Sequence, residues 1–217
     1  MKARDIFEAY EQLILAGKWG MIPRYFLFQH GQRCQTYRDM LLGDQPMKNL
    51  SHCRLIFIYG PPGSGKTTIA QDFATTCFRA EEGLPYFMKP VSKWWDGYRG
   101  EPVVIMDDPS PAAFRKICGS VKVWADRTPF YAEIKGRSMK ACPEWFVITS
   151  NYSIEELAGS DLALAAALRR RTGERQERLF HFAEQTYVPP EAPMTEEDRQ
   201  KYRGVLRDFC NFINDTK

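Results

Sequence analysis

The sequence predicts an α/β protein in which helices flank a parallel sheet, with a small α-helical segment ahead of this core. Short runs of consecutive apolar residues alternate with segments of helical periodicity, which is typical of a parallel sheet. A glycine-rich loop at 60–65 joins the first of these runs directly to a helical segment. The 217 residues are 44% hydrophobic and 26% charged, which excludes a disordered tail or a fibrous repeat.

The N-terminal part of the chain predicts short helices. Apolar residues recur at helical spacing between Ile6 and Ile14. Pro23 suits the first turn of a second helix, and a third is expected over 36–42. The polar connector that follows places a domain boundary near residue 50, so this helical segment is expected to span 1–50.

The core is expected over 51–188. Strands that are buried on both faces appear in a sequence as continuous apolar runs, and the candidates are Leu55–Tyr59, Tyr86–Met88, Val103–Met106, Trp145–Ile148 and Leu179–Phe182. The expected helices are Lys66–Phe78, Ala112–Cys118 and Asp161–Arg170. The stretch Phe130–Lys140 differs, and predicts a β-hairpin with a basic, glycine-containing tip.

Residues 189–217 are expected to form a linker and a C-terminal helix. The run Thr195-Glu196-Glu197-Asp198 resembles a capping box ahead of apolar residues at helical spacing. This amphipathic helix has two possible docking partners, the core of its own chain or a neighbouring subunit.

The loop after the first strand matches the phosphate-binding pattern G-x-x-x-x-G-K-[ST] between a strand and a helix. In this pattern, glycines let backbone N–H groups surround a phosphate, and the helix N-terminus adds partial positive charge. Lys66 would reach the β- and γ-phosphates, and the Thr67 hydroxyl would ligate Mg²⁺. The pattern predicts nucleoside triphosphate binding, with contacts from Gly60, Pro61, Pro62, Gly63, Ser64, Gly65, Lys66, Thr67 and Thr68.

Two carboxylates follow the apolar run that starts at Val103. Asp107 and Asp108 would lie at the carboxyl edge of a parallel sheet, where ligands bind. We expect Asp107 to hold Mg²⁺ and Asp108 to orient or deprotonate the attacking water. Taken alone, Asp-Asp-Pro is equally an ordinary turn, and the upstream phosphate-binding loop favours the functional interpretation.

Asn151 ends the apolar run that starts at Trp145. Its amide could hydrogen-bond both a γ-phosphate and the attacking water, and so sense which nucleotide is bound. Asparagine at a strand end is more often a turn former, so this motif is weak by itself.

Together these motifs resemble the superfamily 3 helicase domain, an AAA+-like ATPase, of the replication initiator proteins (Rep) of circular single-stranded DNA viruses, the circovirus-like group especially. The resemblance covers Leu55 to Phe182. Besides the phosphate-binding loop, it rests on Lys93-Trp94-Trp95-Asp96-Gly97-Tyr98-Arg99-Gly100-Glu101, Glu133-Ile134-Lys135-Gly136, Trp145 to Asn151 and Leu168-Arg169-Arg170-Arg171. The Trp-Trp-Asp-Gly-Tyr segment is more specific than the phosphate-binding loop.

The resemblance implies a homo-oligomeric ring, most often a hexamer, that hydrolyses ATP at its subunit interfaces and moves 3′ to 5′ on single-stranded DNA during rolling-circle replication. It implies that Lys135, Arg137 and Lys140 grip DNA phosphates from the hairpin. It also implies that one of Arg169, Arg170 and Arg171 completes the ATP site of a neighbouring subunit. Which arginine acts stays open.

The same resemblance implies that 1–50 is an oligomerisation segment, and that the host nucleus is the location if the protein is viral. The first residues carry no signal-peptide pattern, so the protein is expected to be intracellular. The family's nicking nuclease is not expected, because His30, His52 and His181 are isolated from one another. The chain is therefore either the helicase portion of a longer protein or a stand-alone relative. Trp94, Trp95 and Tyr98 could stack on bases, but we interpret them as packing in front of the acidic strand.

Composition narrows the alternatives. The six cysteines are scattered singly, which predicts neither a zinc site nor a disulfide framework. No apolar run is long enough to span a membrane, so no membrane partner is expected. The functions left open beside a DNA motor are an RNA helicase similar to those of small positive-strand RNA viruses, a P-loop nucleoside or nucleotide kinase, and a scaffold that binds ATP without hydrolysing it.

Overall fold

The structure, a computed structural model, describes residues 10–16, 18–27, 29–31, 34, 47–78, 83–172, 179–181 and 196–215. The chain divides into two units, 1–48 and 49–217. In the first unit, helical turns at 10–15 and 24–27 flank the short 3-10 helix η1, Trp19–Met21. Their small apolar core contains Ile14, Ile22, Phe26 and Cys34. The helix expected over 36–42 lies outside the described residues.

A five-stranded parallel sheet forms the centre of the second unit, in the order β2-β3-β6-β1-β7. Its strands are β1 Leu55–Tyr59, β2 Tyr86–Met88, β3 Val103–Asp107, β6 Trp145–Ser150 and β7 Leu179–His181. This arrangement confirms the predicted α/β fold. In the register of the sheet Tyr59 pairs with Ser150 and Asp107 pairs with Thr149. The carboxyl ends of β1, β3 and β6 therefore lie side by side.

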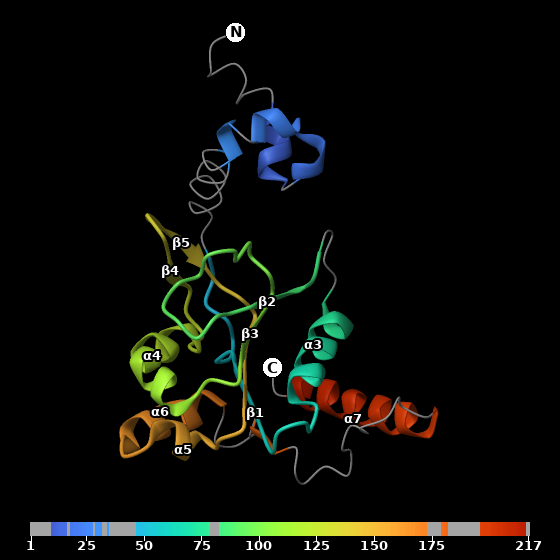
Figure 1. Cartoon of the computed structure of the whole chain (residues 1–217), viewed down its shortest axis with the longest axis vertical. Helices are drawn as coiled ribbons and strands as arrows, with labels where there is room; N and C mark the ends of the chain where they lie inside the picture. Colours follow the sequence, from blue (N-terminus) through green and yellow to red (C-terminus); the bar gives the residue numbers. More distant parts are fainter. Residues whose placement is uncertain are drawn as a thin grey trace. The chain divides into compact units, whose positions relative to one another are not determined.

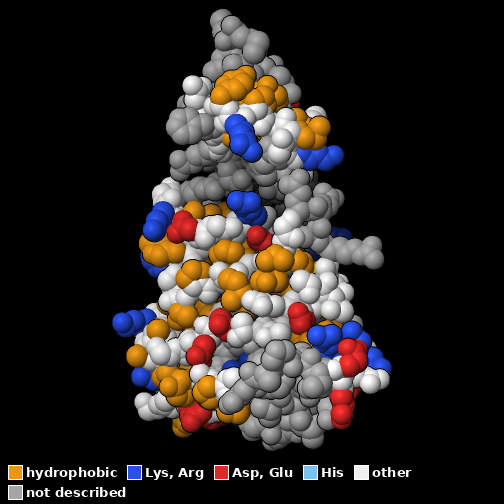
Figure 2. All heavy atoms as spheres, turned by 45° about the vertical axis from the view of Figure 1, so that its right-hand side comes forward, with side chains coloured by type: hydrophobic (Ala, Val, Ile, Leu, Met, Phe, Trp, Pro, Cys, Tyr) orange, Lys and Arg blue, Asp and Glu red, His pale blue; other side chains and the backbone are white. Residues whose placement is uncertain are grey.

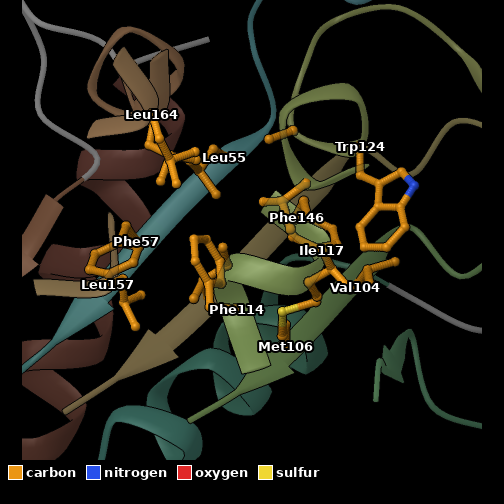
Figure 3. Packing of buried hydrophobic residues seen from close by; sticks show 14 of the residues in the cluster. Leu55, Phe57, Val104, Met106, Phe114, Ile117, Trp124, Phe146, Leu157 and Leu164 are labelled. Atoms are coloured by element: carbon orange, nitrogen blue, oxygen red, sulfur yellow. The ribbon is translucent and has the colours of Figure 1, made fainter. Parts of the chain in front are cut away.

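Helices cover both faces of this sheet (Figure 1). Helices α4 Pro111–Trp124, α5 Ile154–Ala158 and α6 Leu162–Thr172 lie on one side, and α3 Lys66–Cys77 and α7 Glu196–Asp215 on the other. Successive strand residues point to opposite faces, so Leu55 and Phe57 join the core beneath α4 to α6 (Figure 3), whereas Ile56 and Ile58 join the core beneath α3 and α7. Burial on both faces is the reason that the strands appear in the sequence as unbroken apolar runs.

Two helices differ from the expectation. Helix α4 was expected over 112–118, but it continues through Gly119 to Trp124, because Val121 and Trp124 bury their side chains in the core. The short helix α5 was not expected at all. It begins at a capping box in which Ser153 and Glu156 bond each other's backbone N–H groups.

The C-terminal helix α7 packs on α3 of its own chain, which resolves its docking partner. Phe209 lies against Phe73 with ring centroids 5.5 Å apart. The hydroxyl of Tyr202 donates a hydrogen bond to the carboxylate of Asp72. Thr195, at the start of the expected capping box, lies outside the described residues. Within the described part of the chain, no helix is both long and apolar enough to cross a membrane.

The predicted hairpin is present as a separate two-stranded sheet, β4 Phe130–Ile134 and β5 Arg137–Ala141. Gly136 turns the chain at its tip with a φ of 81°, a conformation that suits glycine. One face of β4 is buried against the core through Phe130 and Ala132, and the alternate residue Tyr131 is exposed. The hairpin thus has an anchored face and a solvent face.

Candidate nucleotide site

The phosphate-binding loop connects β1 to α3 with two glycines in left-handed conformations. Gly63 has a φ of 75° and Gly65 a φ of 88°, which other residues adopt only at a cost. No heavy atom beyond the adjacent residues lies within 4 Å of where a Gly63 side chain would start. The Gly60 N–H donates to the Ser150 carbonyl at 3.1 Å, which ties the loop to β6. The glycines therefore shape an open loop with backbone free to face a ligand.

Lys66 begins α3 and is 7% exposed. Its ammonium donates to the carbonyl oxygens of Gly60 at 3.0 Å and Pro61 at 2.8 Å, and to Oδ1 of Asn151 at 2.9 Å. Burial lowers the pKa of Lys66, while the nearby charges of Asp107 and Asp108 act in the opposite direction. All three acceptors are neutral, so an anionic phosphate oxygen would make a stronger, charge-assisted partner for this lysine.

Asp107, the last residue of β3, accepts two short hydrogen bonds on one carboxylate oxygen. The Thr67 hydroxyl donates to its Oδ1 at 2.6 Å, and the Thr149 hydroxyl donates to the same atom at 2.5 Å. Thr149 is fully buried in β6, directly beside Asp107 in the sheet register. Asp107 is thus held in place by one hydroxyl from α3 and one from the neighbouring strand.

Sequence reasoning missed Thr149. A signal for it was available, because Thr149 is a hydroxyl residue that interrupts the apolar run from Trp145. What the sequence could not supply is the pairing of β3 with β6, which brings this hydroxyl to Asp107.

Asp108 follows β3 with a φ of 42°, and within the described residues it is the only one other than glycine with positive φ. Its Oδ1 accepts from the backbone N–H of Asn151 at 3.2 Å, and its Oδ2 accepts from the Asn151 side-chain amide at 2.8 Å. The amide oxygen of Asn151 accepts from Lys66. Asn151 therefore connects Lys66, at the start of α3, to Asp108, the carboxylate that follows β3.

These residues fit ATP with Mg²⁺. Mg²⁺ prefers oxygen ligands and is usually held by one or two protein oxygens together with phosphates. The Thr67 hydroxyl and the Asp107 carboxylate, 2.6 Å apart, present such a pair of oxygens. Bound there, Mg²⁺ would offset the negative charge of the phosphates.

The three adjacent arginines at the end of α6 have different surroundings. Arg171 is 10% exposed and donates to the carbonyls of Lys122 and Ala167 and to Asp126. These bonds engage its whole guanidinium within its own subunit. The expectation that Arg171 could reach a neighbouring subunit therefore conflicts with its burial.

The other two arginines lie nearer the surface. Arg169 pairs with Glu155 at 2.6 Å, which lowers the pKa of that carboxyl. Arg170 is 66% exposed, and its distance to Asp126 is 3.9 Å. Arg170 is the arginine least engaged by the contacts of its own subunit.

The Trp-Trp-Asp-Gly-Tyr segment contributes mainly to the core. Trp95 is fully buried, and its ring meets those of Tyr98 at 5.3 Å and Trp124 at 5.2 Å. The ammonium of Lys89 lies over the rings of Trp95 and Trp124, at 5.2 Å and 4.7 Å from their centroids. Trp95 and Tyr98 therefore pack as structural residues and cannot stack on bases, whereas Trp94 is only half-buried.

The basic residues of the hairpin lie around its tip. Lys135 is exposed, and its backbone N–H donates to Oδ1 of Asp96 at 3.1 Å. Lys140 is half-exposed and stands opposite Tyr131 in the hairpin register. Arg137 begins β5, and its side chain is outside the described part of the chain. On the face drawn in Figure 2, basic, acidic and apolar side chains are interspersed.

The fold and this site are those of a P-loop nucleotide-binding core. Residues 56–152 match the family model described as RNA helicase. The chain is similar to the replication-associated proteins of porcine circovirus 1, at 37% identity over 78% of this chain and 52% of that protein, and of beak and feather disease virus, at 33% identity over 78% and 56%. It is also similar to that of porcine circovirus 2, at 35% identity over 52% of this chain and 34% of that protein. The chain carries a Rep-like helicase domain.

The chain spans about half the length of the first two of these relatives. Among solved structures, the S. cerevisiae Hsp104-ADP complex aligns with 82% of this chain and 36% of that chain, at 17% identity and a TM-score of 0.36.

Proposed function

We propose that this chain is the ATP-driven motor of a viral replication protein, which hydrolyses ATP at the subunit interfaces of a ring and moves along single-stranded DNA. The observation that carries the proposal is the hydrogen-bonded connection of Lys66, Asn151 and Asp108 at the carboxyl edge of the sheet. A loop that only bound nucleotide would not need this connection to a second carboxylate.

The proposed chemistry divides among the residues of this edge. Lys66 holds the γ-phosphate, and Thr67 with Asp107 holds Mg²⁺. Asp108 orients the attacking water or takes its proton, and it is kept in place by the two N–H groups of Asn151. Asn151 contacts both Lys66 and Asp108. A bound phosphate that drew Lys66 away from Asn151 would therefore also change the position of the Asp108 carboxylate.

The ring is proposed to complete each site with an arginine from the next subunit. Arg170 is our first candidate, because it is 66% exposed and only loosely paired, and Arg169 is the second. Such an arginine offsets charge that develops in the transition state, and it can be worth about 10³- to 10⁵-fold in turnover. We propose a hexamer in which residues 1–50 assist assembly.

On the DNA side, we propose that Lys135, Arg137 and Lys140 contact phosphates of a single strand along which the ring moves 3′ to 5′. The place of action is rolling-circle replication of a viral genome, with the host nucleus as its location. The circovirus relatives support this setting, since they are named replication-associated proteins.

The test is ATP hydrolysis measured against protein concentration, with and without a single-stranded DNA oligonucleotide. The proposal expects stimulation by DNA and a rate that rises more steeply than linearly with protein. An Arg170→Ala subunit mixed with a Lys66→Ala subunit should then recover some activity, because each supplies what the other lacks. If the turnover rate per subunit depended neither on DNA nor on protein concentration, the proposal would be overturned and a monomeric ATPase or kinase favoured.

A second candidate is an RNA helicase, which the description of the matching family model favours. Single-stranded RNA and DNA of the same sequence distinguish the two. Stronger stimulation of hydrolysis by RNA would replace the DNA motor with this alternative.

A further inference from the structure

The solvent face of the hairpin carries an exposed tyrosine that the nucleotide site does not use. Tyr131 is 70% exposed although it is the second residue of β4 and is paired with β5. Its partner across the hairpin is Lys140, and the next pair on this face is Glu133 with Ser138. Residues paired across two strands point to the same face of the sheet. The side chains of Tyr131 and Lys140 are therefore neighbours on this face.

Trp94 extends this face beyond β4. It forms a parallel bridge with Glu133, while the N–H of Trp95 donates to the Glu133 carbonyl at 2.8 Å. Successive side chains of an extended segment point to opposite faces. Trp95 is buried in the core, so Trp94 lies on the opposite side, the side of Glu133. The surface formed by Trp94, Tyr131, Glu133 and Lys140 is called the stacking face below.

The charges around the stacking face favour an anionic partner. Glu133 is offset by Lys93, whose ammonium lies 2.8 Å from the carboxylate and 4.5 Å from the centre of the Trp94 ring. Asp96, the other nearby carboxylate, accepts the backbone N–H of Lys135. Lys93, Lys135 and Lys140 thus place three cations around this face against the two carboxylates of Glu133 and Asp96. Figure 1 shows the hairpin as a separate ribbon at the edge of the core.

We propose that the stacking face binds the bases of single-stranded DNA, with Tyr131 stacking on a base while Lys140 and Lys135 hold the adjoining phosphates. The proposal rests on the DNA motor described above and deepens it. Aromatic rings beside a basic track are the means by which proteins hold single strands without reading their sequence, since every base has a stacking face. The hairpin would then grip bases as well as phosphates.

A comparison of two oligonucleotides isolates the stacking contribution. One is a fluorescein-labelled thymidine oligonucleotide, and the other is an abasic oligonucleotide with the same number of phosphates. We expect Tyr131→Ala to weaken binding of the thymidine strand by about 5- to 150-fold and to leave binding of the abasic strand unchanged. Tyr131→Phe keeps the ring and should bind both strands as the unaltered protein does.

The controls separate stacking from charge and assembly. Lys140→Ala should weaken binding of both strands and reduce the salt dependence of the affinity, because one fewer phosphate is neutralised. Leu162→Ala removes an apolar side chain that is 79% exposed on α6 and should change neither affinity. Sedimentation of Tyr131→Ala must match that of the unaltered protein.

Each unfavourable outcome has a distinct meaning. The stacking proposal would be overturned if Tyr131→Ala lost equal affinity for both strands, lost affinity for neither, or changed its oligomeric state. None of these outcomes would contradict the DNA motor. Failure of the unaltered protein to bind either strand would overturn the DNA motor itself, and the stacking face with it.

Discussion

The side-chain amide of Asn151 donates to Oδ2 of Asp108 at 2.8 Å, and the Asn151 backbone N–H donates to Oδ1 of the same carboxylate. These two residues are separated by more than forty positions, and each directly follows a different strand, β3 and β6. A carboxylate that accepts from two N–H groups of one residue has a fixed orientation. The amide oxygen of Asn151 is at the same time bound by Lys66, so one asparagine sets the relative position of a cation and an anion.

Removal of the lysine ammonium should stop hydrolysis. Lys66→Ala is expected to reduce the rate of ATP hydrolysis by at least about 100-fold, because the loss of one positioned donor commonly costs that much. Lys116→Ala, on the exposed side of α4, is the matched control. Steady-state phosphate release measures both variants. Persistent activity in Lys66→Ala would show that the phosphate-binding loop is not the catalytic site.

The Thr149 hydroxyl should matter for Mg²⁺. Thr149→Val keeps the shape of this buried side chain but removes the donor to Asp107. We expect a higher half-saturating Mg²⁺ concentration and a rate about 10-fold lower, since a partner behind a metal ligand typically contributes this much. Thr149→Ser restores the hydroxyl and should recover both values. An unchanged Mg²⁺ titration in Thr149→Val would contradict a positioning role.

The basic hairpin residues should contribute through charge. Replacing Lys135, Arg137 and Lys140 together by alanine should weaken binding of single-stranded DNA. It should also flatten the dependence of affinity on salt by roughly 0.7 per lost phosphate contact. Binding measured at several salt concentrations gives the slope. If the slope is the same in the triple variant, the hairpin lies outside the path of the DNA.

Lys89 should make stability depend on pH. Burial lowers its pKa from 10.5 to about 8, against an opposing charge from Asp96. Between these values the unfolded chain binds more protons than the folded one, so the contribution of this residue to stability rises with pH from about 8 to 10.5 and is flat below. Relative to Lys89→Met, the unaltered protein should gain up to about 1.4 kcal/mol per pH unit in that window.

Urea unfolding at several pH values measures this gain. A constant difference between the unaltered protein and Lys89→Met from neutral pH to pH 10.5 would mean that burial does not lower the pKa of Lys89.

Much of the fold was predictable from the sequence because its determinants are local. The run Leu55–Tyr59 is apolar throughout, and it forms a strand with both faces buried, as expected. The phosphate-binding loop could be identified because a tight turn around a phosphate needs glycine at fixed positions. The predicted range of helix α4 was too short, because Gly119 and Ser120 are weak helix formers. The helix continues past them because Val121 and Trp124 are buried in the core.

The sequence by itself determined the chemistry that is available: a phosphate-binding loop, two carboxylates after one strand and an amide after another. The tertiary structure alone decided which of these groups touch, because strand order sets neighbours that lie far apart in the chain. Insertion of β6 between β1 and β3 brings Thr149 to Asp107 and Asn151 to both Lys66 and Asp108. Burial likewise separated Arg171 from Arg170, and Trp95 from Trp94, since neighbouring residues of one type point to different environments.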